Sequence, residues 1–362
     1  MYALLRPLLF KLGPETSHDL VMNTLGLVSK SKQLTRLCAM LVGAESRSRP
    51  APPQSVQAMG ITFPNPVGLA AGLDKQANAC NALHKMGFGW LELGTVTPQP
   101  QPGNPKPRMF RLPEHRALIN RMGFNSVGLT QFVKNLEQAD PEIIKGINIG
   151  KNAATPLNNA IEDYLIGLRG VYNHADYITI NVSSPNTRNL RDLQQDQALN
   201  QLLCALNLER QQLADNTGKY VPLVVKIAPD LDRRQIESIA SILRQNNIDG
   251  VAATNATLSR RSVEQHALAQ EVGGLSGTPV QNAATEVIAA LYQNLQGEIP
   301  IIGIGGIDSP ESALQKFEAG AKLIQIYTGF IYQGPGLIKT LLDAFPQSAR
   351  HNIFAKPVET KR

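Results

Sequence analysis

Eight short runs of apolar, largely β-branched residues recur along the chain, and segments with helix-like spacing of apolar residues lie between most of them. Buried strands that alternate with helices predict a parallel α/β fold. Eight such units indicate a (β/α)8 TIM barrel, with a doubly wound open sheet as the structural alternative. The predicted strands are Val67–Ala70, Gly89–Gly94, Gly146–Ile149, Tyr177–Val182, Pro222–Ile227, Gly250–Thr254, Pro300–Ile304 and Leu323–Tyr327, and the predicted helices include Ala77–Met86, Ile161–Tyr172, Asp192–Ala214, Asp232–Gln245, Pro279–Asn294 and Pro310–Ala319.

The residues that follow the apolar runs are polar, cationic or glycine. Barrel enzymes place their chemistry at the C-terminal ends of the strands, so we expect these residues to meet in one site. The fourth run continues into Asn181-Val182-Ser183-Ser184-Pro185-Asn186-Thr187, which carries hydroxyl and amide side chains but neither a carboxylate nor a histidine. Such side chains suit a planar, amide-rich ligand better than a metal ion or a peptide.

Glycines follow the last two predicted strands, in Gly303–Asp308 and in Tyr327-Thr328-Gly329. Glycine lets backbone N–H groups approach an anion closely, and this part of a barrel commonly binds phosphate. The pattern therefore predicts a phosphorylated ligand, although glycines that serve only as turns are the alternative.

Two lysines and a pair of asparagines add candidate chemistry. Lys226 lies inside the fifth apolar run, where an ammonium group is costly to bury without an anion. Two roles fit it, a Schiff-base nucleophile or a cation beside a cofactor that becomes anionic on reduction. Lys75 follows the first strand and suits a substrate carboxylate. The amides of Asn120 and Asn125 match the alternating N–H and C=O edge of a pyrimidine.

The composition is that of an ordinary soluble globular protein. The chain has 362 residues, with 35 basic and 29 acidic side chains and a formal net charge of +6. It contains no dense Lys/Arg run and no nucleic-acid-binding signature, so no nucleic-acid partner is expected. Cys38, Cys80, Cys204 and the scattered histidines lack metal-ligand spacing, so no metal site is expected.

The first 45 residues predict a helical, basic extension. Leu4, Leu5, Leu8 and Leu9 recur at helical spacing, but no apolar run is long enough to span a membrane. A helical pair that touches a membrane surface and a helical cap packed on the barrel both fit this pattern. The expected divisions are 1–45 for the extension, 46–54 for a linker, 55–346 for the barrel and 347–362 for a C-terminal tail.

Five motifs together indicate a known family far more specifically than any one of them does alone. They are Ala70–Lys75, Gly94–Pro98, Asn120–Phe124, Asn181–Thr187 and Gly303–Asp308. They resemble dihydroorotate dehydrogenase, specifically its quinone-dependent, membrane-associated class 2. The resemblance implies FMN as the cofactor, one per chain, and oxidation of dihydroorotate to orotate in de novo pyrimidine (UMP) biosynthesis. It also implies a membrane quinone, ubiquinone or menaquinone, as the electron acceptor, and a peripheral position on the cytoplasmic face of the inner membrane.

The resemblance also assigns roles to single residues. Ser184 stands at the position of the class 2 catalytic base, where class 1 has a cysteine, and Lys226 is the cation that stabilises reduced flavin. A serine is a poor base by itself, so a proton relay through Thr187 and water is expected. FMN binding is implied for Ala71, Gly72, Leu73, Asp74, Lys75, Thr95, Asn148, Asn181, Lys226, Thr254, Gly277, Gly306, Tyr327 and Thr328, and substrate binding for Lys75, Asn120, Arg121, Met122, Gly123, Phe124, Asn181, Asn186, Asn255 and Ala256.

The sequence departs from the family pattern at two places. Arg188-Asn189 stand where Pro-Gly is expected, in the loop after Thr187, and this difference bears on how that loop closes. Ala256 follows Asn255 where a hydroxyl residue is common, which removes one substrate hydrogen bond. Two other functions fit the residues alone: a Schiff-base aldolase that uses Lys226, and a membrane-docked flavin-binding protein without turnover.

Overall fold

The computed structural model describes residues 2–41 and 55–345, and its centre is a closed barrel of eight parallel strands. Each of the eight predicted strands is present, so the barrel is confirmed and the open-sheet alternative is wrong. Around the barrel the strands follow chain order, and the last pairs with the first. They are β3 (Val67–Leu69), β4 (Trp90–Val96), β7 (Lys145–Ile149), β8 (Tyr177–Asn181), β9 (Leu223–Ile227), β10 (Gly250–Ala253), β12 (Ile301–Ile304) and β13 (Leu323–Ile326).

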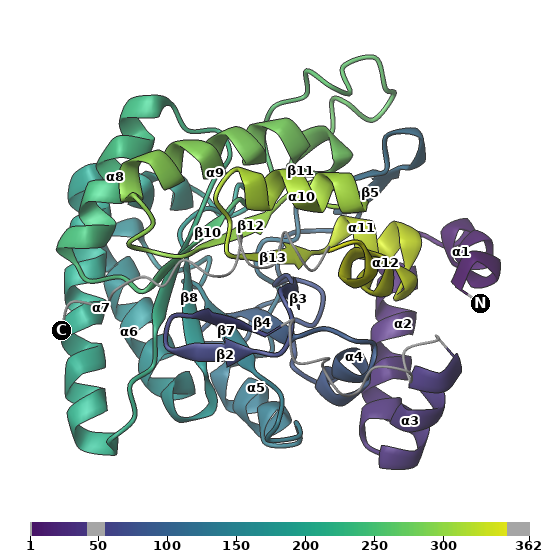
Figure 1. Ribbon diagram of the computed structural model, residues 1–362, viewed down its shortest axis with the longest axis horizontal. Helices are drawn as coiled ribbons and strands as arrows, with labels where there is room; N and C mark the ends of the chain where they lie inside the picture. Colours follow the sequence, from purple (N-terminus) through teal and green to yellow (C-terminus); the bar gives the residue numbers. More distant parts are fainter. Residues whose placement is uncertain (1, 42–54, 346–362) are drawn as a thin grey trace.

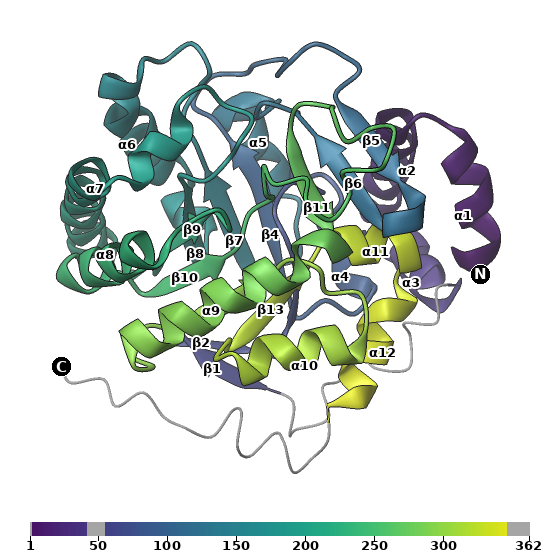
Figure 2. The ribbon, with the colours of Figure 1, turned by 90° about the horizontal axis from the view of Figure 1, so that it is seen from above.

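The strands form because their side chains are buried on both faces, as the continuous apolar runs require. Helices pack around the outside of the barrel (Figures 1 and 2). Their buried apolar residues belong to the same core cluster as those of the strands. In α8, for example, Ile236, Ile239 and Leu243 are buried, and Asp232 caps the first turn by accepting the N–H of Gln235. The outer helices are α4 (Cys80–Lys85), α5 (Gly128–Leu136), α6 (Ala160–Val171), α7 (Asp196–Thr217), α8 (Arg233–Gln245), α9 (Gln281–Leu295), α10 (Pro310–Glu318), α11 (Thr328–Gln333) and α12 (Gly336–Ala344).

Two small antiparallel sheets, which the sequence pattern did not predict, supplement the barrel. The hairpin of β1 (Val56–Ala58) and β2 (Ile61–Phe63) packs the Phe63 ring against Trp90, with ring centres 4.9 Å apart. At the C-terminal ends of the barrel strands, β6 is the central strand of a three-stranded sheet. Its members are β5 (Met109–Leu112), β6 (Ala117–Asn120) and β11 (Gly274–Gly277).

Between residues 2 and 41, the N-terminal extension forms three helices on one side of the barrel (Figure 1). The Tyr2 hydroxyl donates to the carbonyl of Ile331, Arg6 donates to the carbonyl of Tyr332 at 2.9 Å, and Arg111 donates to the carbonyl of Phe10 at 3.1 Å. No helix within 2–41 and 55–345 is long and apolar enough to cross a membrane. The helices are α1 (Tyr2–Lys11), α2 (Pro14–Ser29) and α3 (Lys32–Leu41), whereas the predicted linker 46–54 and tail 347–362 lie outside the described residues.

Candidate active site

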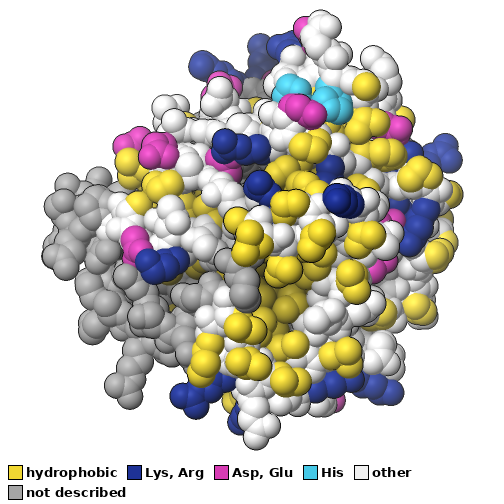
Figure 3. Space-filling view, turned by 90° about the vertical axis from the view of Figure 1, so that its right-hand side faces the viewer, with side chains coloured by type: hydrophobic (Ala, Val, Ile, Leu, Met, Phe, Trp, Pro, Cys, Tyr) yellow, Lys and Arg dark blue, Asp and Glu magenta, His cyan; other side chains and the backbone are white. Residues whose placement is uncertain are grey.

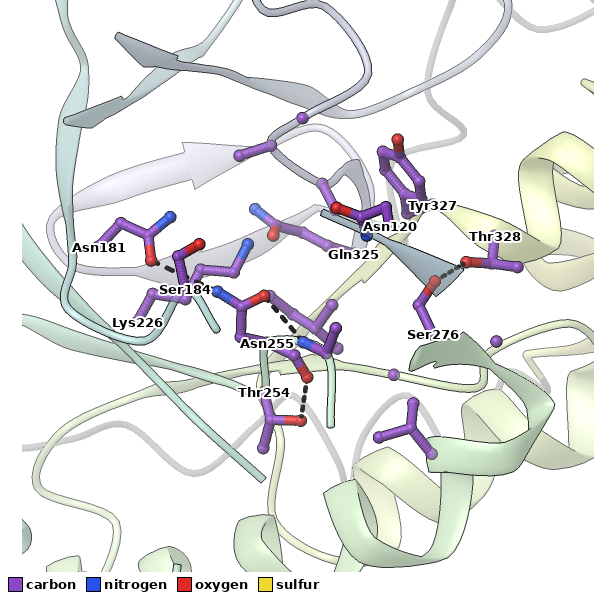
Figure 4. A pocket seen from close by; sticks show the side chains of 18 of the residues that line it. Asn120, Asn181, Ser184, Lys226, Thr254, Asn255, Ser276, Gln325, Tyr327 and Thr328 are labelled. Atoms are coloured by element: carbon purple, nitrogen blue, oxygen red, sulfur yellow. Dashed lines mark hydrogen bonds between the residues drawn. The ribbon is translucent and has the colours of Figure 1, made fainter. Parts of the chain in front are cut away.

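The C-terminal ends of the barrel strands surround a cavity, bordered by residues of β6 and β11. In Figure 4, the side chains of Ser184, Lys226, Asn255 and Gln325 surround one shared space. The loops after different strands thus bring together residues that lie far apart in the sequence. The predicted site residues in its lining are Ala71, Gly72, Lys75, Thr95, Asn120, Met122, Gly123, Phe124, Asn181, Ser184, Asn186, Lys226, Thr254, Asn255, Ala256, Gly277, Gly306, Tyr327 and Thr328.

The two adjacent serines after β8 have different surroundings. Ser183 is fully buried, and its hydroxyl donates to Asn181 Oδ1 at 3.2 Å and accepts from Asn255 Nδ2 at 3.0 Å. Ser184 lines the cavity, and its Oγ accepts the backbone N–H of Asn186 at 3.3 Å. Only the Ser184 hydroxyl, of these two, is therefore placed to exchange a proton with a molecule in the cavity.

Lys226 enters the cavity from β9, with its Nζ 3.8 Å from Oε1 of Glu92. Burial lowers the pKa of the lysine, and the Glu92 carboxylate opposes that shift. Glu92 is itself fully buried, but it accepts hydrogen bonds from Asn148 at 2.8 Å, Tyr177 at 3.0 Å and Gln325 at 2.7 Å. These donors and the nearby ammonium group compensate the cost of burying a carboxylate.

Gln325 and Glu92 are functional candidates that sequence reasoning missed. The amide nitrogen of Gln325 donates to Glu92 and to the Tyr177 hydroxyl, while its Oε1 is buried without a partner in the described part of the chain. Gln325 lines the cavity, and a buried acceptor without a partner is unusual enough to make the residue a candidate. The sequence offered one signal for these two residues. Gln325 and Glu92 are polar residues inside otherwise mainly apolar strands, Leu323–Ile326 and Trp90–Val96.

Lys75 supplies a second cation, from the loop after β3. Its Nζ donates to Oδ1 of Asn125 at 2.6 Å. Burial lowers the pKa of Lys75 to about 7, and the neighbouring Arg108 guanidinium adds to this effect. An anionic ligand next to Lys75 would reverse the shift, because it favours the charged ammonium.

Glycines form one wall of the cavity, where side chains would collide with the backbone. At Gly306 (φ +71°) a Cβ would lie 2.6 Å from Cα of Gln281, and at Gly329 it would lie 2.2 Å from the carbonyl oxygen of Ile307. Gly277 (φ +99°) is equally confined, 2.3 Å from the Arg116 carbonyl oxygen. The glycines therefore let the backbone segments around the cavity pack against one another, and glycine N–H groups in such a wall suit an anionic group.

The comparisons with known proteins identify the family of the chain. A family model described as dihydroorotate dehydrogenase matches residues 54–348. The chain belongs to the dihydroorotate dehydrogenase family. It is 55% identical to a protein of Chromobacterium violaceum (93% of this chain, 95% of the relative) and 53% identical to one of Nitrosospira multiformis (93% and 94%), both named dihydroorotate dehydrogenase (quinone).

A solved structure shares the fold as well. The dihydroorotate dehydrogenase of Eimeria tenella, crystallised with ferulenol, superposes with a TM-score of 0.83 at 36% identity and covers 96% of each chain. Membership of this family makes the chain an oxidoreductase.

Four residues that the family resemblance singled out lie outside the cavity lining. The Asp74 carboxylate turns inward and accepts the N–H groups of Asn78 at 3.2 Å and Ala79 at 2.9 Å. The Arg121 guanidinium turns outward to Glu271 at 2.6 Å. Asn148 is fully buried behind Thr95, whose hydroxyl donates to its Oδ1. The four residues are Leu73, Asp74, Arg121 and Asn148.

The dehydrogenase cavity lies close to the N-terminal extension. His18 of α2 is hydrogen-bonded through Nε2 to the carbonyl of Leu73 at 3.0 Å, two residues before Lys75. Glu15 of α2 pairs with the Arg108 guanidinium at 2.8 Å, and this contact lowers the pKa of the Glu15 carboxyl although burial opposes it. The loop after β3 therefore contacts both the cavity and the extension.

Proposed function

We propose that this member of the family oxidises dihydroorotate to orotate in de novo pyrimidine (UMP) biosynthesis, with FMN as the bound cofactor and a membrane quinone as the final electron acceptor. The observation that carries the proposal is the convergence of Ser184, Lys226, Lys75 and the asparagine amides on one cavity at the strand ends. Dihydroorotate has a carboxylate and an alternating amide edge, and these match a lysine and several asparagines.

The cavity lining fits FMN. Gly277, Gly306 and Gly329 would hold the phosphate through backbone N–H groups, and Lys226 would balance negative charge on the ring system. The unpartnered Gln325 Oε1 supplies an acceptor for a ring N–H group. When bound, FMN supplies the redox chemistry, because it accepts two electrons from the substrate.

Ser184 is the proposed base that removes the proton from C5 of the substrate. In the described part of the chain its Oγ accepts the backbone N–H of Asn186 at 3.3 Å, and no protein group accepts its own O–H, so a water molecule would have to take that proton. Thr187 lies in the same loop, and its buried Oγ1 has no partner in the described residues. That hydroxyl is the proposed site for a water molecule that carries the proton onward.

Lys75, Asn120, Asn186 and Asn255 are the proposed substrate contacts. Lys75 would bind the carboxylate, and the amides would bind the pyrimidine edge. Asn186 Nδ2 already donates to Asn120 Oδ1 at 3.2 Å, while Asn186 Oδ1 is buried without a partner in the described part of the chain. The substrate would supply that missing partner.

The N-terminal extension is the proposed entrance for quinone and the contact with the membrane, at the cytoplasmic face of the inner membrane. Leu4, Leu8 and Leu37 expose 78%, 61% and 50% of their surface. Figure 3 shows apolar side chains gathered on this side of the molecule, with Lys and Arg side chains around them. An apolar surface bordered by cations suits a bilayer with anionic lipids.

The visible spectrum of the purified protein tests the proposal. We expect a yellow protein that dihydroorotate bleaches without oxygen and that a short-chain quinone restores. A yellow protein that dihydroorotate fails to bleach would indicate flavin binding without turnover. A colourless protein that borohydride traps with a carbonyl substrate would indicate the Schiff-base aldolase, with Lys226 as its nucleophile.

A further inference from the structure

Arg191 ties together the loops that follow three neighbouring strands. It lies in the short 3₁₀ segment Leu190–Gln194, in the loop that begins at Val182, directly after β8. Its Nε donates to the Ser183 carbonyl at 3.1 Å and its Nη2 to the Ala256 carbonyl at 2.8 Å. Its Nη1 donates to Oδ2 of Asp230 at 2.7 Å. One guanidinium therefore connects the loops after β8, β9 and β10.

Two of those three loops carry residues of the cavity. Ser183 immediately precedes Ser184, and Ala256 immediately follows Asn255. Ser184, Asn255 and Ala256 all line the cavity, whereas Arg191 does not. Arg191 thus acts on the site only through the backbone that carries the cavity residues.

Asp230 anchors the guanidinium from the third loop. Its carboxylate also accepts the Thr257 hydroxyl and the N–H of Leu258, the latter at 3.0 Å. The ion pair is partly shielded, with 19% of the Arg191 side chain and 28% of the Asp230 side chain exposed. The guanidinium group of arginine is rigid and planar, and its N–H donors can bond three acceptors in fixed directions. A lysine ammonium on a flexible side chain does this less well.

We propose that Arg191, anchored by Asp230, is a positioning residue that fixes Ser184 relative to Asn255 across the substrate cavity. The inference rests on the proposed role of Ser184 as the base. Inside the cavity wall, the Ser183 hydroxyl already joins the same two loops through Asn255 Nδ2 at 3.0 Å. Arg191 links the same two loops from outside the cavity lining, through the carbonyls of Ser183 and Ala256. Two sets of hydrogen bonds therefore fix the short segment that carries Ser184.

The expected consequence is a slower proton abstraction with a smaller loss of ligand affinity. A displacement of about 1 Å at a reacting group is enough to cost on the order of 10²-fold in rate. Two of the proposed substrate contacts, Asn186 and Asn255, lie in loops that Arg191 holds. The other two, Lys75 and Asn120, come from the loop after β3 and from β6, which Arg191 does not touch, so binding should suffer less than the chemical step. A purely structural cross-link would instead lower the unfolding temperature and leave the chemical step unchanged.

The test compares Arg191→Gln, Arg191→Lys and Asp230→Asn in the full-length holoenzyme. We expect Arg191→Gln to slow anaerobic bleaching by saturating dihydroorotate by about tenfold to a hundredfold, and to raise the dissociation constant of orotate by a smaller factor. Hydrogen exchange of residues 183–195 should become faster without substrate. Arg191→Lys should recover part of the rate, and Arg191→Gln with Asp230→Asn should be no slower than Arg191→Gln alone.

A matched control removes a comparable ion pair far from the cavity. Arg169 of α6 donates to Glu209 of α7 through Nε at 2.8 Å, so Arg169→Gln should bleach at the normal rate. Normal bleaching in Arg191→Gln overturns the proposal, as does a fall in orotate affinity that accounts for the whole effect. If Arg191→Gln does not accumulate, normal bleaching in both Arg191→Lys and Asp230→Asn overturns it.

Ser184→Ala, measured alongside, separates this inference from the proposed function. Slow bleaching in Ser184→Ala with normal bleaching in Arg191→Gln rejects the positioning role alone. Normal bleaching in Ser184→Ala rejects the serine as the base, and the positioning role of Arg191 falls with it.

Discussion

The cavity at the strand ends and the N-terminal extension expose opposite kinds of surface. In the cavity wall, Asn181, Ser183 and Asn255 bond to one another, and each buried polar group occupies a fixed direction. On the extension, leucines such as Leu4 and Leu8 remain largely in contact with solvent. Buried polar groups are stabilised by hydrogen-bond partners, and such pairing fixes the positions of their atoms. Exposed apolar side chains are stabilised only by a partner that removes them from water.

This contrast separates two kinds of consequence. Changes in the cavity should alter the chemical step or the retention of the cofactor, because the positions of polar atoms determine both. Changes on the exposed face of the extension should alter access to lipid and quinone while the chemical step continues. The following substitutions test that division, in order of the effect expected.

Ser184→Ala should have the largest effect, because it removes the proposed base from the cavity. We expect anaerobic bleaching by dihydroorotate to slow by a factor on the order of 10²–10⁴, with FMN content and orotate affinity retained. Ser183→Ala is measured beside it and should slow bleaching less, because the Ser183 hydroxyl bonds to Asn181 and Asn255 and the residue does not line the cavity. Bleaching at a near-normal rate in Ser184→Ala would exclude this serine as the base.

Lys226→Met should weaken FMN retention, because it removes the cation that β9 places in the cavity. Loss of a charge-assisted hydrogen bond is worth about 1.5–3 kcal/mol, or roughly a 10- to 100-fold weaker affinity for FMN. Reduction should also be slower. The measurement is FMN content after dialysis, together with the stopped-flow rate of bleaching.

The Lys226 substitution leaves Glu92 buried without its cation, so a double variant is needed. Lys226→Met with Glu92→Gln removes both charges, while Asn148, Tyr177 and Gln325 remain in place around position 92. If the double variant recovers normal FMN retention and bleaching, the effect of Lys226→Met comes from the unpaired carboxylate. A packing role alone is indicated if Lys226→Met itself behaves as the wild type.

The barrel could be predicted from sequence because parallel strands buried on both faces appear as continuous apolar runs. Their polar C-terminal ends then identified most of the cavity lining. The sheet of β5, β6 and β11 could not be predicted in this way, because β11 (Gly274–Gly277) has a single large apolar residue, Leu275, and pairs with distant β6. Contacts over such a separation leave no local signal in a single sequence.

The direction of individual side chains was the other feature that could not be predicted from the sequence. Asp74 stands within a motif that predicted contact with the cofactor, yet its carboxylate satisfies backbone N–H groups of its own loop. Gln325 and Glu92 were overlooked because one polar residue in an apolar strand does not reveal its partner. Local hydrogen bonding and pairing across the barrel decide these positions, and neither follows from residue type alone.

Leu4→Ser combined with Leu8→Ser and Leu37→Ser should separate membrane contact from chemistry. Removing these exposed leucines should reduce sedimentation with vesicles of anionic lipid and turnover with long-tailed quinone, because apolar burial drives both. Bleaching by dihydroorotate and turnover with a soluble acceptor should stay normal. Leu208→Ser on α7, where 56% of the side chain is exposed, is the control. Unchanged vesicle binding in the triple variant would make the extension a structural cap.

Asn189→Gly should have the smallest effect, although it lies in the loop that carries Ser184. Asn189 adopts a left-handed backbone conformation (φ +56°, ψ 11°), which glycine and asparagine tolerate better than other residues. We expect Asn189→Gly to change the free energy of unfolding by less than about 1 kcal/mol, and the bleaching rate hardly at all. Asn189→Val should cost about 1–2 kcal/mol, because a β-branched residue strains this conformation. Urea unfolding of the three proteins measures the difference, and equal stability of the valine variant would contradict the assignment of strain to this position.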